Sequence, residues 1–152
     1  MKKISFTLYG LLIGALFAIF GGIFFGAIIV LVMMGIPTTF NDLGEIAFGF
    51  GVAGLYSVAF ALIPGAAGGA YLAYWLGKSE RTPREVTRHG LLIGALAGLI
   101  AVIAFTGIFM HFLFDWMMFG FAILAIAVAS GTSFLAAKYL ARKKEKFVRP
   151  QA

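Results

Sequence analysis

His111 and Asp115 are the residues of this chain whose types and spacing best suit chemistry, since an imidazole and a carboxylate lie four positions apart. Such a pair can bind a divalent cation, respond to pH, or act as a general base. Asp42 and Glu45 stand between two long uncharged runs and can join the pair. Each of these carboxylates also suits a helix N-cap, and the histidine suits a polar membrane interface. Because two ligands without a third do not define a metal site, we predict no metal and no other cofactor.

A second group of residues could line a binding cavity. Pro64-Gly65 lies inside a long apolar run, where a proline removes a backbone hydrogen bond and kinks a helix. Ser130, Thr132 and Ser133 form a hydroxyl cluster in another run. Broken helices at the interface between repeats mark binding sites in transporters. Alternatively, hydroxyls or water satisfy the freed carbonyls and no ligand binds. Further hydroxyls lie at Tyr56, Ser57 and Thr106.

The composition of the 152-residue chain decides its class. Hydrophobic residues make up 62% and charged residues 12%, against about 45–50% and about 25% in ordinary domains. The mean hydropathy is +1.01. A soluble domain of this length cannot bury so much apolar surface. A cytosolic enzyme, a nucleic-acid-binding domain and a disordered tail are therefore excluded. The absence of cysteine excludes disulfides and thiolate metal sites.

Four uncharged runs each exceed the roughly 20 residues that a helix needs to cross a bilayer. We predict an all-α integral membrane protein with one transmembrane domain over residues 1–152. The four transmembrane helices are expected at about 5–34, 46–77, 89–113 and 116–138. The sequence Thr82-Pro83-Arg84-Glu85 is typical of a capping box with proline at the first helical position. A helix is therefore expected to begin near Pro83.

The twelve lysine and arginine residues gather on one side of the predicted spans. They fall within 2–3, 78–88 and 138–149, whereas the other two connections carry only acidic charge. The positive-inside rule then puts both termini in the cytoplasm, and we expect a prokaryotic plasma membrane. The basic tail 139–152 can bind anionic lipid headgroups or simply act as stop-transfer charge. No nucleic-acid partner is predicted, because no recognition motif accompanies the charge.

Three short segments occur twice and in the same order. Residues 10–16 recur identically as 90–96, residues 48–50 as 119–121, and residues 71–73 as 139–141. Each half of the chain is thus predicted to be one helical hairpin that enters the membrane from the cytoplasm. The two hairpins are expected to be parallel repeats, related by a pseudo-two-fold axis along the membrane normal.

Small residues recur at every fourth position, which aligns them on one face of each helix. Close backbone approach across such residues is what associates helices in lipid. These faces either pack the four helices of one subunit or form a seam between subunits, and both roles can hold together. The predicted packing residues are Gly10, Gly14, Ala18, Gly22, Gly26, Gly65, Gly69, Gly90, Gly94, Gly98, Ala129 and Ser133.

Three functional hypotheses follow. No Asp, Glu, Lys or Arg lies in the middle of a predicted span, so catalysis or ion coupling inside the membrane is disfavoured. The first hypothesis is a non-enzymatic packing or assembly component, either a homo-oligomer or a subunit with a membrane-protein partner. The second is an oligomeric channel or small-solute transporter that uses Pro64 and the hydroxyl cluster, since four helices alone are expected to enclose little space. The third is a lipid-modifying enzyme with His111 and Asp115 as its general base.

Overall fold

The computed structural model describes residues 2–34, 40–109 and 116–148, and four α-helices make up nearly all of this part of the chain. The helices are α1 (Lys2–Met34), α2 (Phe40–Lys78), α3 (Pro83–Phe109) and α4 (Trp116–Val148). Each is long and apolar enough to cross a membrane. The candidate spans are Ser5–Met33, Gly44–Lys78, Pro83–Ile108 and Phe119–Lys144. The predicted class, an all-α integral membrane protein with four spanning helices, is confirmed.

The start of α3 follows the predicted capping box. The backbone N–H of Thr82 donates to Glu85 Oε2 over 2.8 Å, and the N–H of Glu85 donates to Thr82 Oγ1 over 3.3 Å. The N–H of Val86 donates to the Thr82 carbonyl oxygen over 3.1 Å. These bonds satisfy backbone donors that have no partner inside the helix. The expected beginning of the helix at Pro83 is confirmed.

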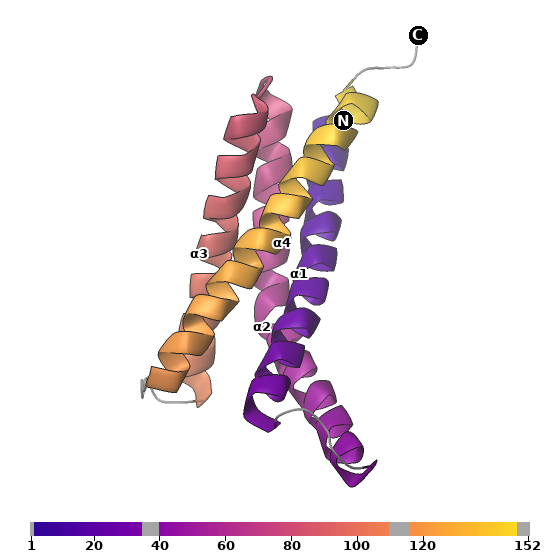
Figure 1. Cartoon of the computed structure of the whole chain (residues 1–152). Helices are drawn as coiled ribbons and strands as arrows, with labels where there is room; N and C mark the ends of the chain where they lie inside the picture. The colour runs from indigo at the N-terminus through magenta and orange to yellow at the C-terminus, as the bar shows by residue number, and fades with distance from the viewer. Residues whose placement is uncertain (1, 35–39, 110–115, 149–152) are drawn as a thin grey trace.

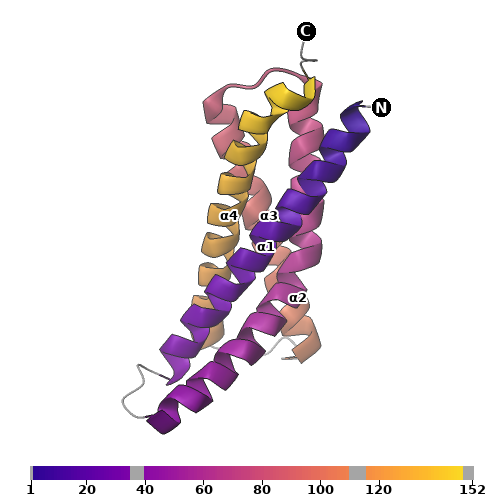
Figure 2. The same ribbon diagram turned by 90° about the vertical axis from the view of Figure 1, so that its right-hand side faces the viewer.

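The helices form two hairpins that meet at one end of the molecule. The first hairpin consists of α1 and α2, and the second consists of α3 and α4. The two helices of each hairpin contact each other more extensively than any two helices from different hairpins do. Figures 1 and 2 show the hairpins side by side at the end where α1 begins and α4 ends, and diverging toward the opposite end.

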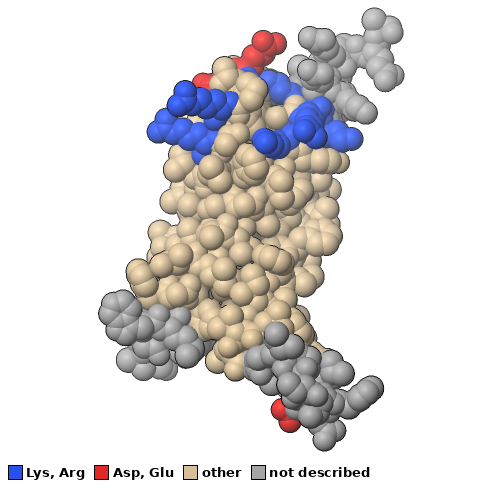
Figure 3. All heavy atoms as spheres, in the orientation of Figure 1, with Lys and Arg blue, Asp and Glu red and all other residues tan. Residues whose placement is uncertain are grey.

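The end at which the hairpins meet also carries the basic residues, and we call it the basic end. Figure 3 shows the described lysine and arginine side chains gathered there, above a broad uncharged band. Glu45, by contrast, is exposed near the start of α2, toward the opposite end. The described basic side chains of this end are Lys78, Arg81, Arg84, Arg88, Lys138, Arg142, Lys143 and Lys144.

The predicted basic tail begins as a continuation of α4, which runs on to Val148. Lys144 Nζ donates a hydrogen bond to the carbonyl oxygen of Ser79 over 2.8 Å. Ser79 follows the last residue of α2. The end of the second hairpin is therefore bonded to the connection that leaves the first.

The helices of the first hairpin touch through their backbones at the predicted small residues. A Cβ atom placed on Gly14 would overlap the carbonyl oxygen of Gly65 and lie 2.7 Å from the Cα of Gly69. One placed on Gly22 would lie 2.9 Å from the Cα of Val58. A side chain at either position would thus separate α1 from α2. In the same seam, Gly10 lies against Ala73, Ala18 against Gly65, and Gly26 against Gly54.

The second hairpin has an equivalent seam. A Cβ atom on Gly94 would overlap the carbonyl oxygen of Ala129 and lie 2.5 Å from the Cα of Ser130. One on Gly98 would lie 2.9 Å from the Cα of Ile126. Glycine is required at these positions because the neighbouring atoms belong to backbone, which cannot move aside. At the basic end of this seam, Gly90 lies against Ser133, Phe134 and Ala137.

Replacing Gly14 with leucine should destabilise the first hairpin. The new side chain would collide with the backbone of α2, and overpacking of this kind costs about 1–3 kcal/mol or more. Gly51→Leu is the matched control, because a Cβ there meets no atom within 4 Å. Thermal unfolding in mild detergent, followed by circular dichroism, should give a lower Tm for the first variant only. Equal melting temperatures would contradict the seam.

Candidate functional site

A cavity of about 800 Å³ lies between the two hairpins and is partly open to its surroundings. Ligand-binding pockets are usually about 300–1,000 Å³, so one small molecule fits. All four helices line it, mostly with glycine, alanine and aromatic side chains. The expectation that four helices enclose little space is therefore wrong, since this cavity forms within a single chain. Its aromatic residues are Phe17, Phe25, Tyr56, Phe60, Phe105 and Phe121.

Hydroxyl groups provide the polar side chains of the cavity, and none of the described residues that line it is charged. The Thr132 hydroxyl donates to the carbonyl oxygens of Val128 and Ala129, over 3.0 and 3.1 Å. The Thr106 hydroxyl, which is 3% exposed, donates to carbonyls of its own helix in the same way. These bonds use the hydroxyl protons and leave oxygen lone pairs available as acceptors. Ser57, Tyr56 and Ser133 supply the other hydroxyls.

The hydroxyls occupy two levels along the helices. Ser133 is six residues before Tyr139, which lies at the basic end, and this spacing corresponds to about 9 Å along a helix. Ser57 is eighteen residues before Trp75, which also lies at the basic end, and this spacing corresponds to about 27 Å along a helix. Thr132 shares the first level, and Thr106 is close to the second. Between the two levels the wall is almost entirely apolar.

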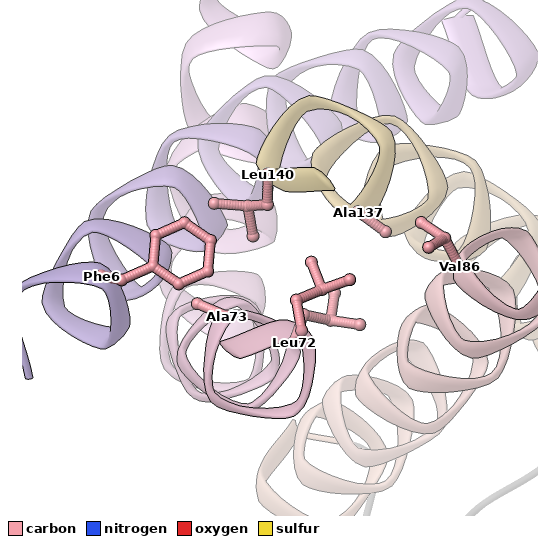
Figure 4. Close-up of a cluster of buried hydrophobic side chains, with 7 residues drawn as sticks. Phe6, Leu72, Ala73, Val86, Ala137 and Leu140 are labelled. Atoms are coloured by element: carbon pink, nitrogen blue, oxygen red, sulfur yellow. The ribbon is translucent and has the colours of Figure 1, made fainter. Parts of the chain in front are cut away.

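A cluster of buried side chains closes the cavity at the basic end. Figure 4 shows members of this cluster from all four helices pointing toward one another. Ala73, Ala137 and Leu140 are fully buried. The hairpins are therefore packed together at this end by side chains that fill the space between them. The cluster consists of Phe6, Leu72, Ala73, Leu76, Val86, Ala137 and Leu140.

Two aromatic pairs flank the cluster and join the hairpins. Tyr9 of α1 stacks on Tyr139 of α4, with a distance of 3.0 Å between their hydroxyl oxygens. Trp75 of α2 stacks on His89 of α3, with ring centroids 3.9 Å apart. The guanidinium of Arg81 lies 4.6 Å from the centroid of the Trp75 ring and adds a cation–π contact. Each pair thus links one helix of each hairpin.

The residues predicted for a cavity divide into two groups. Gly65, Thr132 and Ser133 line the cavity. Pro64 lies inside α2 but is not a lining residue, and neither is Ser130, whose Cα packs against Gly94 instead. Figures 1 and 2 show α2 changing direction between its two halves, as a helix containing an internal proline does. Of the predicted packing residues, Gly14, Ala18, Gly22, Gly69, Gly98 and Ala129 also border the cavity beside their seams.

The aromatic lining of the cavity was not predicted from the sequence. Part of this lining could have been predicted from the internal repeat. Phe25 and Phe105 are separated by the same 80 positions as the repeated segments 10–16 and 90–96. Tyr56, Ser57 and Thr106 were expected as hydroxyl donors near such a cavity and do line it. In the far half of the bundle, Phe60 and Phe105 meet edge to face, with centroids 5.6 Å apart.

The predicted His111 and Asp115 pair lies outside the described residues, and so does the side chain of Asp42. Within the described part of the chain, no three histidine, aspartate or glutamate side chains come together as a metal site would require. No known protein family, curated protein or solved structure matches the chain. The cavity is therefore the feature from which a function can be inferred.

Replacing Trp75 with alanine should weaken the joint between the hairpins. The variant loses the stack on His89 and the contact with Arg81, worth about 0.5–1.5 kcal/mol beyond the lost apolar burial. Tyr74→Ala is the control, since that neighbouring ring is exposed. Thermal unfolding in detergent should show a clear fall in Tm for Trp75→Ala and a small change for Tyr74→Ala. A fall of the same size in both would argue against the joint.

Proposed function

We propose that this chain is a small membrane carrier that holds one largely apolar molecule between its two hairpins. The cavity carries the proposal, because it has the size of a ligand site and draws its wall from all four helices. It is closed by the buried cluster at the basic end, and the hairpins diverge at the other end. The molecule would therefore enter from the end opposite the basic residues. We propose no catalytic step.

An assembly role has less support than a carrier role. Such a role would use the faces of small residues, and the glycines of those faces lie against the partner helix inside each hairpin. They are thus already occupied within one chain. One chain forms the cavity by itself, so the oligomer that was predicted for a channel is not needed to enclose a binding space.

We further propose that the hairpins are parallel repeats with the cavity on the axis between them. The seams support this, because Gly10 faces Ala73 while Gly90 faces Ala137. The glycines are 80 positions apart and the alanines 64. With the same two offsets, Tyr9 corresponds to His89 and Trp75 to Tyr139. The two aromatic pairs that join the hairpins are then equivalent.

This register differs from part of the sequence matching. The match of residues 10–16 with 90–96 agrees with the seams. Residues 71–73 and 139–141 are 68 positions apart, whereas the alanines aligned by the seams are 64 apart. The two alignments differ by about one helical turn. Residues 48–50 and 119–121 are 71 apart, which is about two turns away. Short matches of this kind arise easily in sequences rich in leucine, alanine, glycine and phenylalanine.

We propose that the basic end faces the cytoplasm, in a prokaryotic plasma membrane. The support is the charge asymmetry, because lysine and arginine are retained on the cytoplasmic side. Both termini are then cytoplasmic, and the molecule enters from the outer leaflet. Anionic lipid headgroups are the expected partners of the exposed basic side chains, each worth about 1 kcal/mol near the surface.

Placing a large side chain inside the cavity should expel the bound molecule. Ala122 lines the cavity, whereas Ala127 on the same helix is exposed and does not. Wild-type protein, Ala122→Phe and Ala127→Phe would be purified in mild detergent, and bound molecules extracted and quantified by mass spectrometry. We expect a molecule retained near one per chain by the wild type and Ala127→Phe, and at least about fivefold less by Ala122→Phe, because the new ring takes its space.

The comparison also separates cavity binding from lipid that merely surrounds the helices. Surrounding lipid would be retained equally by all three proteins, and that result would overturn the carrier proposal. Melting curves establish that each variant is folded before retention is compared.

A further inference from the structure

We infer that the molecule held in this cavity is an uncharged amphiphile, with a hydroxyl-bearing head group at Thr132 and Ser133 and a hydrocarbon chain along the aromatic wall. This rests on the proposed carrier function and names its ligand class. Three properties of the described wall carry it: the absence of charge among its residues, the position of the hydroxyls, and the apolar length between them.

The uncharged wall favours an uncharged ligand. A charged group inside the hydrocarbon region is costly unless an opposite charge or several hydrogen bonds compensate it. Among the residues that the structure describes, those lining the cavity include no aspartate, glutamate, lysine, arginine or histidine. The basic side chains at the cytoplasmic end are separated from the cavity by the buried cluster. Neither an anionic nor a cationic head group therefore finds a partner.

The hydroxyl pair favours a head group that can donate hydrogen bonds. The Thr132 proton is already shared between two carbonyls of its own helix, so its oxygen meets a ligand only as an acceptor. Ser133 adds a second hydroxyl one residue along. An alcohol can donate to one oxygen and accept from the other, whereas an ester or ketone can only accept. In lipid, where no water competes, an unmatched polar group would be expensive.

The wall between the two hydroxyl levels favours a chain. Along the helix axes, the level of Ser133 and the level of Ser57 are about 18 Å apart. Aromatic rings and small residues line the cavity over this length. Phe25, Phe60 and Phe105 present apolar surface there. A small polyol would leave that surface without a partner, while a hydrocarbon chain covers it and reaches the end where the hairpins diverge.

The test uses a radiolabelled monoacylglycerol in phosphatidylcholine nanodiscs, with empty nanodiscs to subtract partitioning. We expect saturable binding at one site per chain. Unlabelled molecules with the same chain but a sulfate or a trimethylammonium head should compete about 100-fold more weakly, because their charge is unpaired. Glycerol should not compete at all.

Variants locate the head group. Thr132→Val combined with Ser133→Ala removes both hydroxyls with little change in volume and should weaken binding about tenfold. Ser130→Ala is the matched control, because Ser130 neighbours the pair but does not line the cavity, and it should bind like the wild type. Equal binding by the double variant, or equal competition by a charged amphiphile, would overturn the inference.

Failure of this inference is distinguishable from failure of the carrier proposal. If no monoacylglycerol binds while Ala122→Phe still loses a molecule that Ala127→Phe keeps, the cavity binds another class and only the ligand assignment falls. If retention is the same in both phenylalanine variants, the carrier proposal falls as well.

Discussion

Backbone contact across glycine is the interaction on which the rest of this structure depends. In a bilayer, apolar side chains gain little by leaving lipid for protein, so helices associate by close packing rather than by burial alone. Gly14 and Gly94 allow their helices to approach until backbone meets backbone. Each hairpin is consequently a rigid unit with its small residues turned inward. What remains between the hairpins has to be filled by side chains, and the cluster of buried residues that fills it lies at the basic end.

The cavity follows from that division of the packing. At the basic end, Leu72, Leu76 and Leu140 fill the space between the hairpins and are almost completely buried. Farther along, the residues that line the gap are mostly glycine, alanine and aromatic residues, and Phe60 makes an edge contact with Phe105 across it. The same small residues that make each hairpin tight therefore leave the space between the hairpins open. The close packing of helices inside each hairpin and the cavity between the hairpins have the same cause, which is the abundance of small residues.

The sequence predicts the elements of this fold well because charge and proline chemistry mark their limits. Uncharged runs predict four spanning helices, and the Thr82 and Glu85 capping box predicts the start of α3.

The faces of the helices are harder to predict, since lipid and protein interior are equally apolar and a lipid-facing side chain resembles a buried one. Phe25 and Phe20 look alike in sequence, yet one lines the cavity and the other is exposed. Gly65, Thr132 and Ser133 could be assigned to a cavity because kinks and hydroxyls are rare in such runs. The aromatic wall could not be, except through the 80-residue offset.

The backbone seam inside the first hairpin has a consequence for biosynthesis. The chain emerges from the ribosome N-terminus first, and everything the α1–α2 seam requires is present once Lys78 has been made. The first hairpin can therefore assemble in the membrane while the second is still being translated. The second hairpin then docks onto the first through the buried cluster at the basic end. Since each seam joins two helices that follow one another in the chain, assembly can proceed as two local steps followed by one joining step.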